Sequence, residues 1–157
     1  MRTDIELNLT ARLIESITGR STLLFRPPYG EDIEPETPEQ IEPLVRSNSF
    51  GYVTVGMRID PNDWASPTPA TIVSRVVEQA EKQTGNIVLL HDSGGDRTNT
   101  LLALPSIIRE LRARGYEFVN VNSLIPVSKE SIMPLVAQNE QMITRGSGFF
   151  FQMLHWV

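Results

Sequence analysis

The chain has 157 residues, of which 40% are hydrophobic and 21% are charged, a balance that suits one folded domain and excludes a disordered chain. Nineteen acidic against fourteen basic residues give a net charge of −5 with no basic cluster, which excludes a nucleic-acid partner. The absence of cysteine excludes disulfides, a thiolate metal site and a cysteine nucleophile.

The first third of the chain predicts a helix, a strand and an acidic loop. Apolar side chains recur at helical spacing over residues 4–18, and Gly19 is a natural stop for that helix. Residues 22–26 predict a short buried strand, which ends at Pro27. The stretch EDIEPETPEQIEP then predicts a surface loop that runs into a short helix before Pro43.

The middle of the chain predicts a second strand and a second long helix. Residues 51–59 are rich in β-branched and aromatic side chains, which favour a strand. Residues 70–83 predict a helix, with Ser66 or Thr68 as its N-cap and Gly85 as its end.

The remaining elements continue the alternation. Residues 86–91, NIVLLH, predict a third strand, and DSGGDRTNT predicts a loop after it. The following helix is predicted to begin near residue 104, because Pro105 is best tolerated in a first turn. Residues 116–124 predict a fourth strand. Together the elements predict an α/β fold in which helices cover parallel strands.

Polar side chains follow three successive predicted strands. Arg26 and Tyr29 come after the first, residues 60–64 after the second, and His91 after the third. Loops at the carboxyl ends of parallel strands meet, so these groups predict one pocket fed by three loops. Each group alone has an ordinary interpretation: an arginine paired with an acid, a proline turn, a packing tryptophan, or a histidine satisfied by a neighbouring carboxylate.

The same residues resemble three motifs of the polysaccharide deacetylases of carbohydrate esterase family four, also called the chitooligosaccharide deacetylase homology domain. Arg-x-Pro-Tyr is present at residues 26–29, and Asp-x-x-Asp-Trp at residues 60–64. The motif that ends in Leu-His falls on residues 86–91, where Asn86 replaces the first leucine. The resemblance is to the C-terminal part of the domain.

This resemblance implies part of a distorted (β/α) barrel and hydrolysis of the N-acetyl amide of N-acetylglucosamine-type carbohydrate polymers, outside the cytoplasm or at the cell surface. His91 matches the family's acid, which protonates the departing amine, and Asp63 matches the residue that orients it. Arg26 matches the residue that steadies the base aspartate. The backbone N–H of Tyr29 matches the oxyanion donor.

Three further residues match the substrate-binding part of the family's site. Trp64 and Leu90 correspond to residues that wall the pocket for the acetyl methyl group. Asp60 opens the same motif as Asp63 and is expected among the substrate-binding residues.

The resemblance also implies a divalent metal, usually zinc, that polarises the acetyl carbonyl. The family's Thr-Phe-Asp-Asp and His-x-x-x-His motifs supply the base and the metal ligands, and neither occurs in this sequence. The two histidines, His91 and His155, cannot supply such a ligand set. We therefore expect the acid half of the site, no complete metal site and no activity of this chain alone. The alternative is an inactive sugar-binding or membrane-tethered form.

Residues 1–125 are expected to form the partial deacetylase domain, and residues 126–157 a connector and an aromatic tail, similar to the connectors that join such domains to a family-two glycosyltransferase. The charged amino terminus does not predict a signal peptide. The tail ends in GFFFQMLHWV, which predicts either a packed helix or the front edge of a membrane segment. Four strands leave free edges, which either the first helix and the tail cover or a second copy pairs with.

Overall fold

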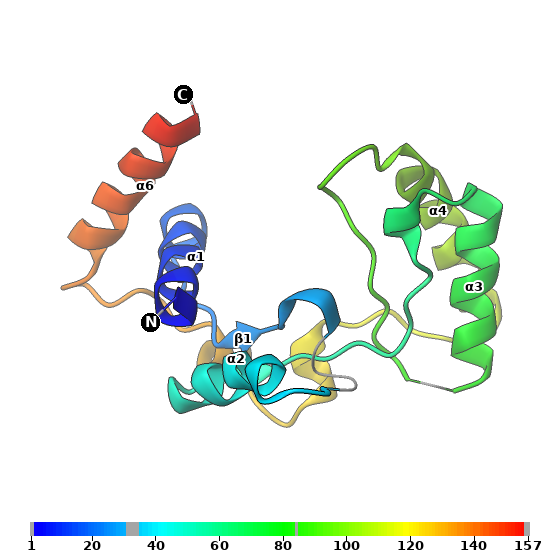
Figure 1. Cartoon of the computed structure of the whole chain (residues 1–157), viewed down its shortest axis with the longest axis horizontal. Helices are drawn as coiled ribbons and strands as arrows, with labels where there is room; N and C mark the ends of the chain where they lie inside the picture. The colour runs from blue at the N-terminus through cyan, green and yellow to red at the C-terminus, as the bar shows by residue number, and fades with distance from the viewer. Residues whose placement is uncertain (1, 31–34, 84, 156–157) are drawn as a thin grey trace. The chain divides into compact units, whose positions relative to one another are not determined.

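The computed structural model describes residues 2–30, 35–83 and 85–155, and its path is shown in Figure 1. The chain forms two compact units: unit 1 consists of Met1–Val55 with Val119–Val157, and unit 2 consists of Gly56–Phe118. Unit 1 therefore contains both ends of the chain, and unit 2 is a continuous stretch between its two parts. Residues 31–34 of the predicted acidic loop and residues 156–157 of the aromatic tail lie outside the described residues.

Unit 1 is built around two short parallel strands, β1 (Leu24–Phe25) and β2 (Val53–Thr54). The residue before β1 is bonded on both sides: the N–H of Leu23 donates to the carbonyl of Ile132 at 2.8 Å, and its own carbonyl accepts from the N–H of Val53 at 2.7 Å. The later part of the chain therefore covers one edge of this small sheet, in line with one of the two alternatives predicted for its free edges.

The described residues of unit 1 form four helices besides that sheet. They are α1 (Arg2–Thr18), α2 (Pro38–Ser49), α5 (Lys129–Ile132) and α6 (Gln141–His155), with 3-10 turns η1 (Pro28–Gly30) and η3 (Val121–Leu124). α1 packs against α6, drawn in blue and orange-red in Figure 1. Gly148 is part of this contact, because a Cβ at that position would lie 3.1 Å from the Cβ of Ser16. Arg46 joins α2 to α1, since its Nη2 donates to Asp4 at 2.7 Å.

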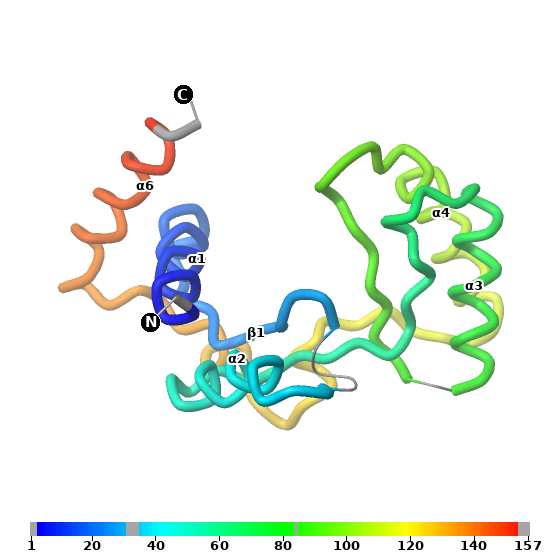
Figure 2. The backbone as a smooth tube through the Cα atoms, in the orientation of Figure 1, coloured from blue at the N-terminus to red at the C-terminus, as the bar shows by residue number. Residues whose placement is uncertain are grey.

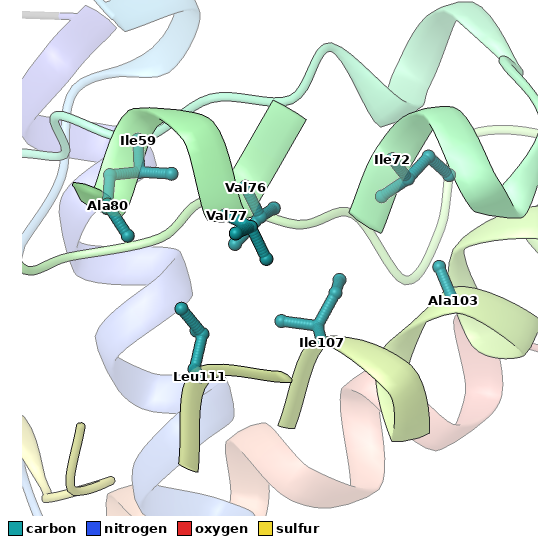
Figure 3. Close-up of a cluster of buried hydrophobic side chains, with 8 residues drawn as sticks. All are labelled: Ile59, Ile72, Val76, Val77, Ala80, Ala103, Ile107 and Leu111. Atoms are coloured by element: carbon teal, nitrogen blue, oxygen red, sulfur yellow. The ribbon is translucent and has the colours of Figure 1, made fainter. Parts of the chain in front are cut away.

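Unit 2 consists of two helices packed over two extended segments. The helices are α3 (Pro69–Glu81) and α4 (Thr98–Ala113), and between the extended segments Ile59 and Val88 form a parallel bridge. Figure 2 shows these segments running beside one another before each turns toward its helix. The core of unit 2 is drawn in Figure 3 and comprises Ile59, Ile72, Val76, Val77, Ala80, Ala103, Ile107 and Leu111. Burying each large apolar side chain contributes about 1.5–3 kcal/mol, so this core is the main source of stability in unit 2.

Helical spacing predicted the long helices correctly where no proline intervened. The helix over residues 4–18 and its stop at Gly19, which has a φ of 68°, are confirmed. The N-cap of α3 is Thr68, whose Oγ1 accepts from the N–H of Thr71 at 3.2 Å. The predicted end at Gly85 is wrong: α3 ends at Glu81, because Gln83 already adopts a left-handed φ of 53°.

Two helix boundaries that were predicted from prolines are wrong. α2 continues through Pro43 to Ser49, and α4 begins at Thr98 and passes through Pro105. An interior proline removes one helical hydrogen bond and costs about 3 kcal/mol. In α4 the buried side chains on either side of Pro105, Ala103 and Ile107, offset that cost.

The strand predictions gave the right segments but overestimated their lengths. Residues 22–26 and 51–59 contain β1 and β2, and residues 86–91 form a single bridge at Val88. The fourth strand, over residues 116–124, is wrong: residues 121–124 form the 3-10 turn η3 and residues 116–120 carry no regular structure. A strand requires a partner for its ladder of hydrogen bonds, and side-chain type alone cannot show whether a partner lies alongside. The parallel α/β class itself is confirmed.

Candidate active site

A tight turn in unit 2 positions Asp63. Oδ1 of Asp60 accepts from the N–H of Asn62 at 2.7 Å, the side chain–backbone bond of an Asx turn. Asn62 and Ser66 have left-handed φ values of 54° and 53° and bracket the 3-10 turn η2 (Asp63–Ala65). This sharp geometry directs Asp63 inward, where it is 1% exposed, while its neighbour Trp64 is 56% exposed.

Asp63 and His91 form a hydrogen-bonded pair although they come from different extended segments. Nδ1 of His91 lies 2.8 Å from Oδ1 of Asp63, and the backbone N–H of His91 donates to Oδ2 at 2.9 Å. The side chain of Asp63 is fully buried, whereas that of His91 is 35% exposed. The carboxylate thus holds the imidazole through Nδ1, and Nε2 is the ring nitrogen directed away from this bond.

The carboxylate of Asp63 is stabilised in its charged form. Burial raises its pKa, but hydrogen bonds from the backbone and ring of His91 and from Thr100 outweigh burial and lower the pKa below its usual value. Oγ1 of Thr100 donates to Oδ2 at 2.8 Å. Asp63 thus occupies Nδ1 of His91, which leaves Nε2 as the ring nitrogen that can exchange a proton with a bound group.

Arg97 joins the loop after His91 to the turn that carries Asp63. Its guanidinium donates to the carbonyls of Trp64, Ser93 and Gly94 at 3.1, 2.9 and 2.9 Å. Gly94 has a φ of 80°, a left-handed conformation that glycine adopts without strain. No motif predicted this role for Arg97, since contacts to backbone carbonyls have no characteristic spacing.

The other residues predicted to bind substrate in unit 2 have different surroundings. Leu90 is partly buried and packs against the core. The backbone of Asp60 is fixed by Gln79, which accepts from its N–H at 3.0 Å and donates to its carbonyl at 2.9 Å. Trp64 is the one of the three that is largely exposed, so it presents an apolar face beside Asp63.

Arg26 and Tyr29 belong to unit 1, where they line a cavity of about 440 Å³ with Phe25, Tyr52 and one face of α1. All of the cavity's lining residues belong to unit 1, so neither Asp63 nor His91 contributes to it. Tyr29 has a left-handed backbone (φ 60°, ψ 10°), and the residue is 98% exposed, so packing of its side chain does not account for this conformation. Such a conformation costs on the order of 1–3 kcal/mol in a residue other than glycine and is often found at functional sites. The single pocket fed by three loops stays a prediction.

Comparisons with known proteins find carbohydrate deacetylases among the relatives of this chain. No family model matches it. It is 42% identical over 110 residues to a peptidoglycan-N-acetylglucosamine deacetylase of Bacillus cereus, covering 68% of this chain and 46% of that protein. It is 30% identical over 125 residues to a chitooligosaccharide deacetylase of Azorhizobium caulinodans, covering 72% and 55%. A crystal structure of a peptidoglycan N-acetylglucosamine deacetylase, solved with 4-naphthalen-1-yl-N-oxidanyl-benzamide, superposes with a TM-score of 0.68 and 25% identity, covering 82% of this chain and 56% of that one.

The chain belongs to the polysaccharide deacetylase family. The resemblance seen in the sequence and the predicted fold class are thereby confirmed, and the structure corresponds to part of a polysaccharide deacetylase fold. The chain spans about half the length of the relatives it matches, 46% and 55% of the two deacetylases. The fusion to a glycosyltransferase stays a prediction.

The metal that the polysaccharide deacetylase family implies does not fit the residues at this site. Among residues 2–30, 35–83 and 85–155, no three histidine or carboxylate side chains lie together as a ligand set. Both oxygens of Asp63 are already engaged, by the ring and backbone of His91 and by Thr100. The described part of the chain therefore offers the hydrogen-bonded pair of Asp63 and His91 but not a set of zinc ligands.

Proposed function

We propose that this polysaccharide deacetylase chain supplies the proton-donating half of a site that hydrolyses the N-acetyl amide of N-acetylglucosamine-type polymers. Relatives are named for peptidoglycan and chitooligosaccharides, which favours such polymers as substrates and an extracytoplasmic or cell-surface location. The observation that carries the proposal is the pair of a buried, charged Asp63 with a partly exposed His91, joined at 2.8 Å.

The chemistry of the pair follows from the demands of amide hydrolysis. An amine is a poor leaving group unless its nitrogen is protonated as the C–N bond breaks. Nε2 of His91 would deliver that proton, and the charge of Asp63 would stabilise the imidazolium before the transfer. In the wider family a divalent metal supplies Lewis-acid activation of the carbonyl. We propose that this activation requires groups other than the described residues, so that the chain alone does not hydrolyse its substrate.

Two residues of unit 1 are proposed to serve the same reaction. The backbone N–H of Tyr29 would donate to the developing oxyanion, and its strained backbone supports a functional reason for that conformation. Arg26 would orient a carboxylate base, as the motif resemblance implies. Trp64, Leu90 and Asp60 would shape the acetyl and sugar side of the site.

A chimera tests the proposal. The 110 matched residues of this chain would replace their counterparts in the Bacillus cereus deacetylase, which contributes the remainder of its own fold. We expect the chimera to release acetate from N-acetylglucosamine oligomers, and His91→Ala to lower the rate about 10²- to 10⁴-fold, the usual contribution of a general acid. Asp92→Ala is the matched control, because Asp92 is the exposed neighbour of His91.

Full activity of the His91→Ala chimera would contradict the proposal. The intact chain is assayed in parallel with Zn²⁺. Acetate release that depends on His91 would show that the chain forms a metal site of its own. Oligomer binding by the intact chain without acetate release, insensitive to a chelator, combined with an inactive chimera, would favour the sugar-binding form.

A specific observation on α6 favours a second proposal, association with a lipid surface. Met142, Phe149 and Met153 lie on one face of the helix and are 84%, 66% and 58% exposed, whereas Thr144 is buried and Gly148 lies against α1. Residues 141–157 contain one arginine and no acidic residue, in a chain of net charge −5. An apolar face with aromatic side chains and no negative charge suits the interfacial region of a bilayer. Within the described residues, no helix is both long enough and apolar enough to cross one.

Vesicle flotation tests this proposal. We expect the intact chain to float with phosphatidylcholine–phosphatidylglycerol vesicles, and Phe149→Ser with Phe150→Ser to abolish flotation. Phe118→Ser is the matched control, since Phe118 is 50% exposed in unit 2. A chain that stays in the soluble fraction would contradict the proposal. A dimer in sedimentation that the same double substitution dissociates would assign the face to a second copy.

A further inference from the structure

Thr100 is the polar end of the buried face of α4. The buried residues of this helix are Thr100, Ala103, Ile107 and Leu111, spaced by three or four positions. The last three belong to the apolar core of unit 2, whereas Oγ1 of Thr100 donates to Oδ2 of Asp63 at 2.8 Å. The face that anchors the helix in the core therefore also reaches the Asp63–His91 pair.

We propose that Thr100 is a positioning residue of the deacetylase site, which fixes the rotation of the Asp63 carboxylate so that Oδ1 stays on Nδ1 of His91. This inference rests on the proposed function, in which His91 delivers a proton. Thr100 itself contacts neither ring nitrogen in this arrangement; it acts through Asp63.

The geometry shows why such a residue is needed. The terminal torsion of an aspartate is broad and roughly two-fold, so the bonds to Oδ2 decide how far the carboxylate can rotate away from the ring. Oδ2 accepts two bonds from two different segments, from the N–H of His91 at 2.9 Å and from Thr100 at 2.8 Å. With Oδ2 occupied in this way, Oδ1 is left for the ring, at 2.8 Å.

The start of α4 holds Thr100 in place independently of Asp63. Oδ1 of Asp96 accepts from the N–H and the hydroxyl of Thr98 at 2.9 and 2.6 Å, which fixes the first turn of the helix. The N-terminal turn of a helix also favours negative charge, here the carboxylate of Asp63. A purely structural role for Thr100 would require only that its hydroxyl find some acceptor, and it would not affect the ring of His91.

Nitrogen-15 NMR of the imidazole distinguishes these roles in the intact chain. Neutral His91 is expected to carry its proton on Nδ1, directed at Asp63, and a His155→Gln background leaves one histidine signal to read. Thr100→Val keeps the shape of the side chain and removes the donor, so we expect loss of the single-tautomer pattern and a mixture of Nδ1- and Nε2-protonated forms. Thr100→Ser is expected to restore it, and Leu101→Ala, at the adjacent position of the same helix that is 64% exposed, to leave it unchanged.

Each result decides the matter. A single Nδ1-protonated tautomer in Thr100→Val would overturn the inference, and Thr100→Ala provides the same test should the valine variant not fold. A mixture of tautomers already in the wild type would overturn it as well, because the pair would not hold the ring. If Thr100→Val keeps a single tautomer while His91→Ala still abolishes acetate release by the chimera, the proposed function stands. Only the role of Thr100 is then contradicted.

Discussion

The two units of the chain differ in where their apolar side chains lie. In unit 2 eight apolar side chains form a buried core beside the hydrogen-bonded Asp63–His91 pair, although Leu101 and Leu102 of α4 are exposed. In unit 1 large apolar side chains of α1 and α6 face outward, such as Ile17 at 75% and Phe149 at 66% exposed. The Asp63–His91 pair therefore lies beside a buried core, whereas Arg26 and Tyr29 belong to a unit in which large side chains of two packed helices are exposed.

Replacing one isoleucine by alanine in each unit should give the largest difference in the free energy of unfolding. Ile107→Ala removes a side chain that is 2% exposed in the core of unit 2, and we expect it to lower the free energy of unfolding by about 3 kcal/mol. Ile17→Ala in α1 of unit 1 should change it by less than about 0.5 kcal/mol. Urea unfolding of both variants measures the difference, and equal losses would mean that the two units are packed alike.

Removing the buried carboxylate should have the next largest effect. Asp63→Ala leaves the N–H of His91 and the hydroxyl of Thr100 without their acceptor in a buried position, which should cost about 2–3 kcal/mol of unfolding free energy. Asp92→Ala, at an exposed position of the same unit, should leave stability nearly unchanged. An Asp63→Ala protein as stable as the Asp92→Ala control would show that the buried bonds contribute nothing to the fold.

The loss of unfolding free energy at acid pH should differ between the two units, by less than the losses caused by the substitutions above. Asp63 in unit 2 and Asp4 in unit 1 both have a lowered pKa. For Asp63 the largest influence is burial, which raises the pKa, but the hydrogen bonds from His91 and Thr100 together outweigh it. For Asp4 the largest influence is the hydrogen bond from Arg46, which lowers the pKa. A carboxyl whose pKa is lower in the folded state stabilises the fold above its unfolded pKa, near 4, and this stabilisation is lost as the pH falls through the folded value.

Salt distinguishes the two carboxylates. High salt should screen the exposed pair of Asp4 and Arg46 and leave the buried Asp63 almost unaffected. Unfolding curves between neutral and acid pH, at low and high salt, should therefore show a salt-resistant acid transition that Asp63→Asn removes. An acid transition that disappears in high salt would place its origin at exposed pairs instead.

Apolar runs that end abruptly predicted that residues 60–64 and His91 lie at one edge of parallel strands, and the resemblance to the polysaccharide deacetylases implied the pairing of Asp63 with His91. It missed Thr100 for a particular reason. The rule that places proline in a first turn moved the predicted start of α4 to residue 104 and left Thr100 in a loop, whereas packing in the core carries the helix through Pro105. The fourth strand failed because β-branched side chains cannot reveal whether a neighbouring strand is present.

The most direct test of the central claim is a double-mutant cycle on acetate release in the chimera. If Asp63 and His91 act as one proton-delivering unit, His91→Ala and Asp63→Asn should each lower the rate, and the double variant should be no slower than His91→Ala alone. Losses that simply multiply would show that Asp63 and His91 act independently, and would contradict the assignment of this pair as the acid of the site.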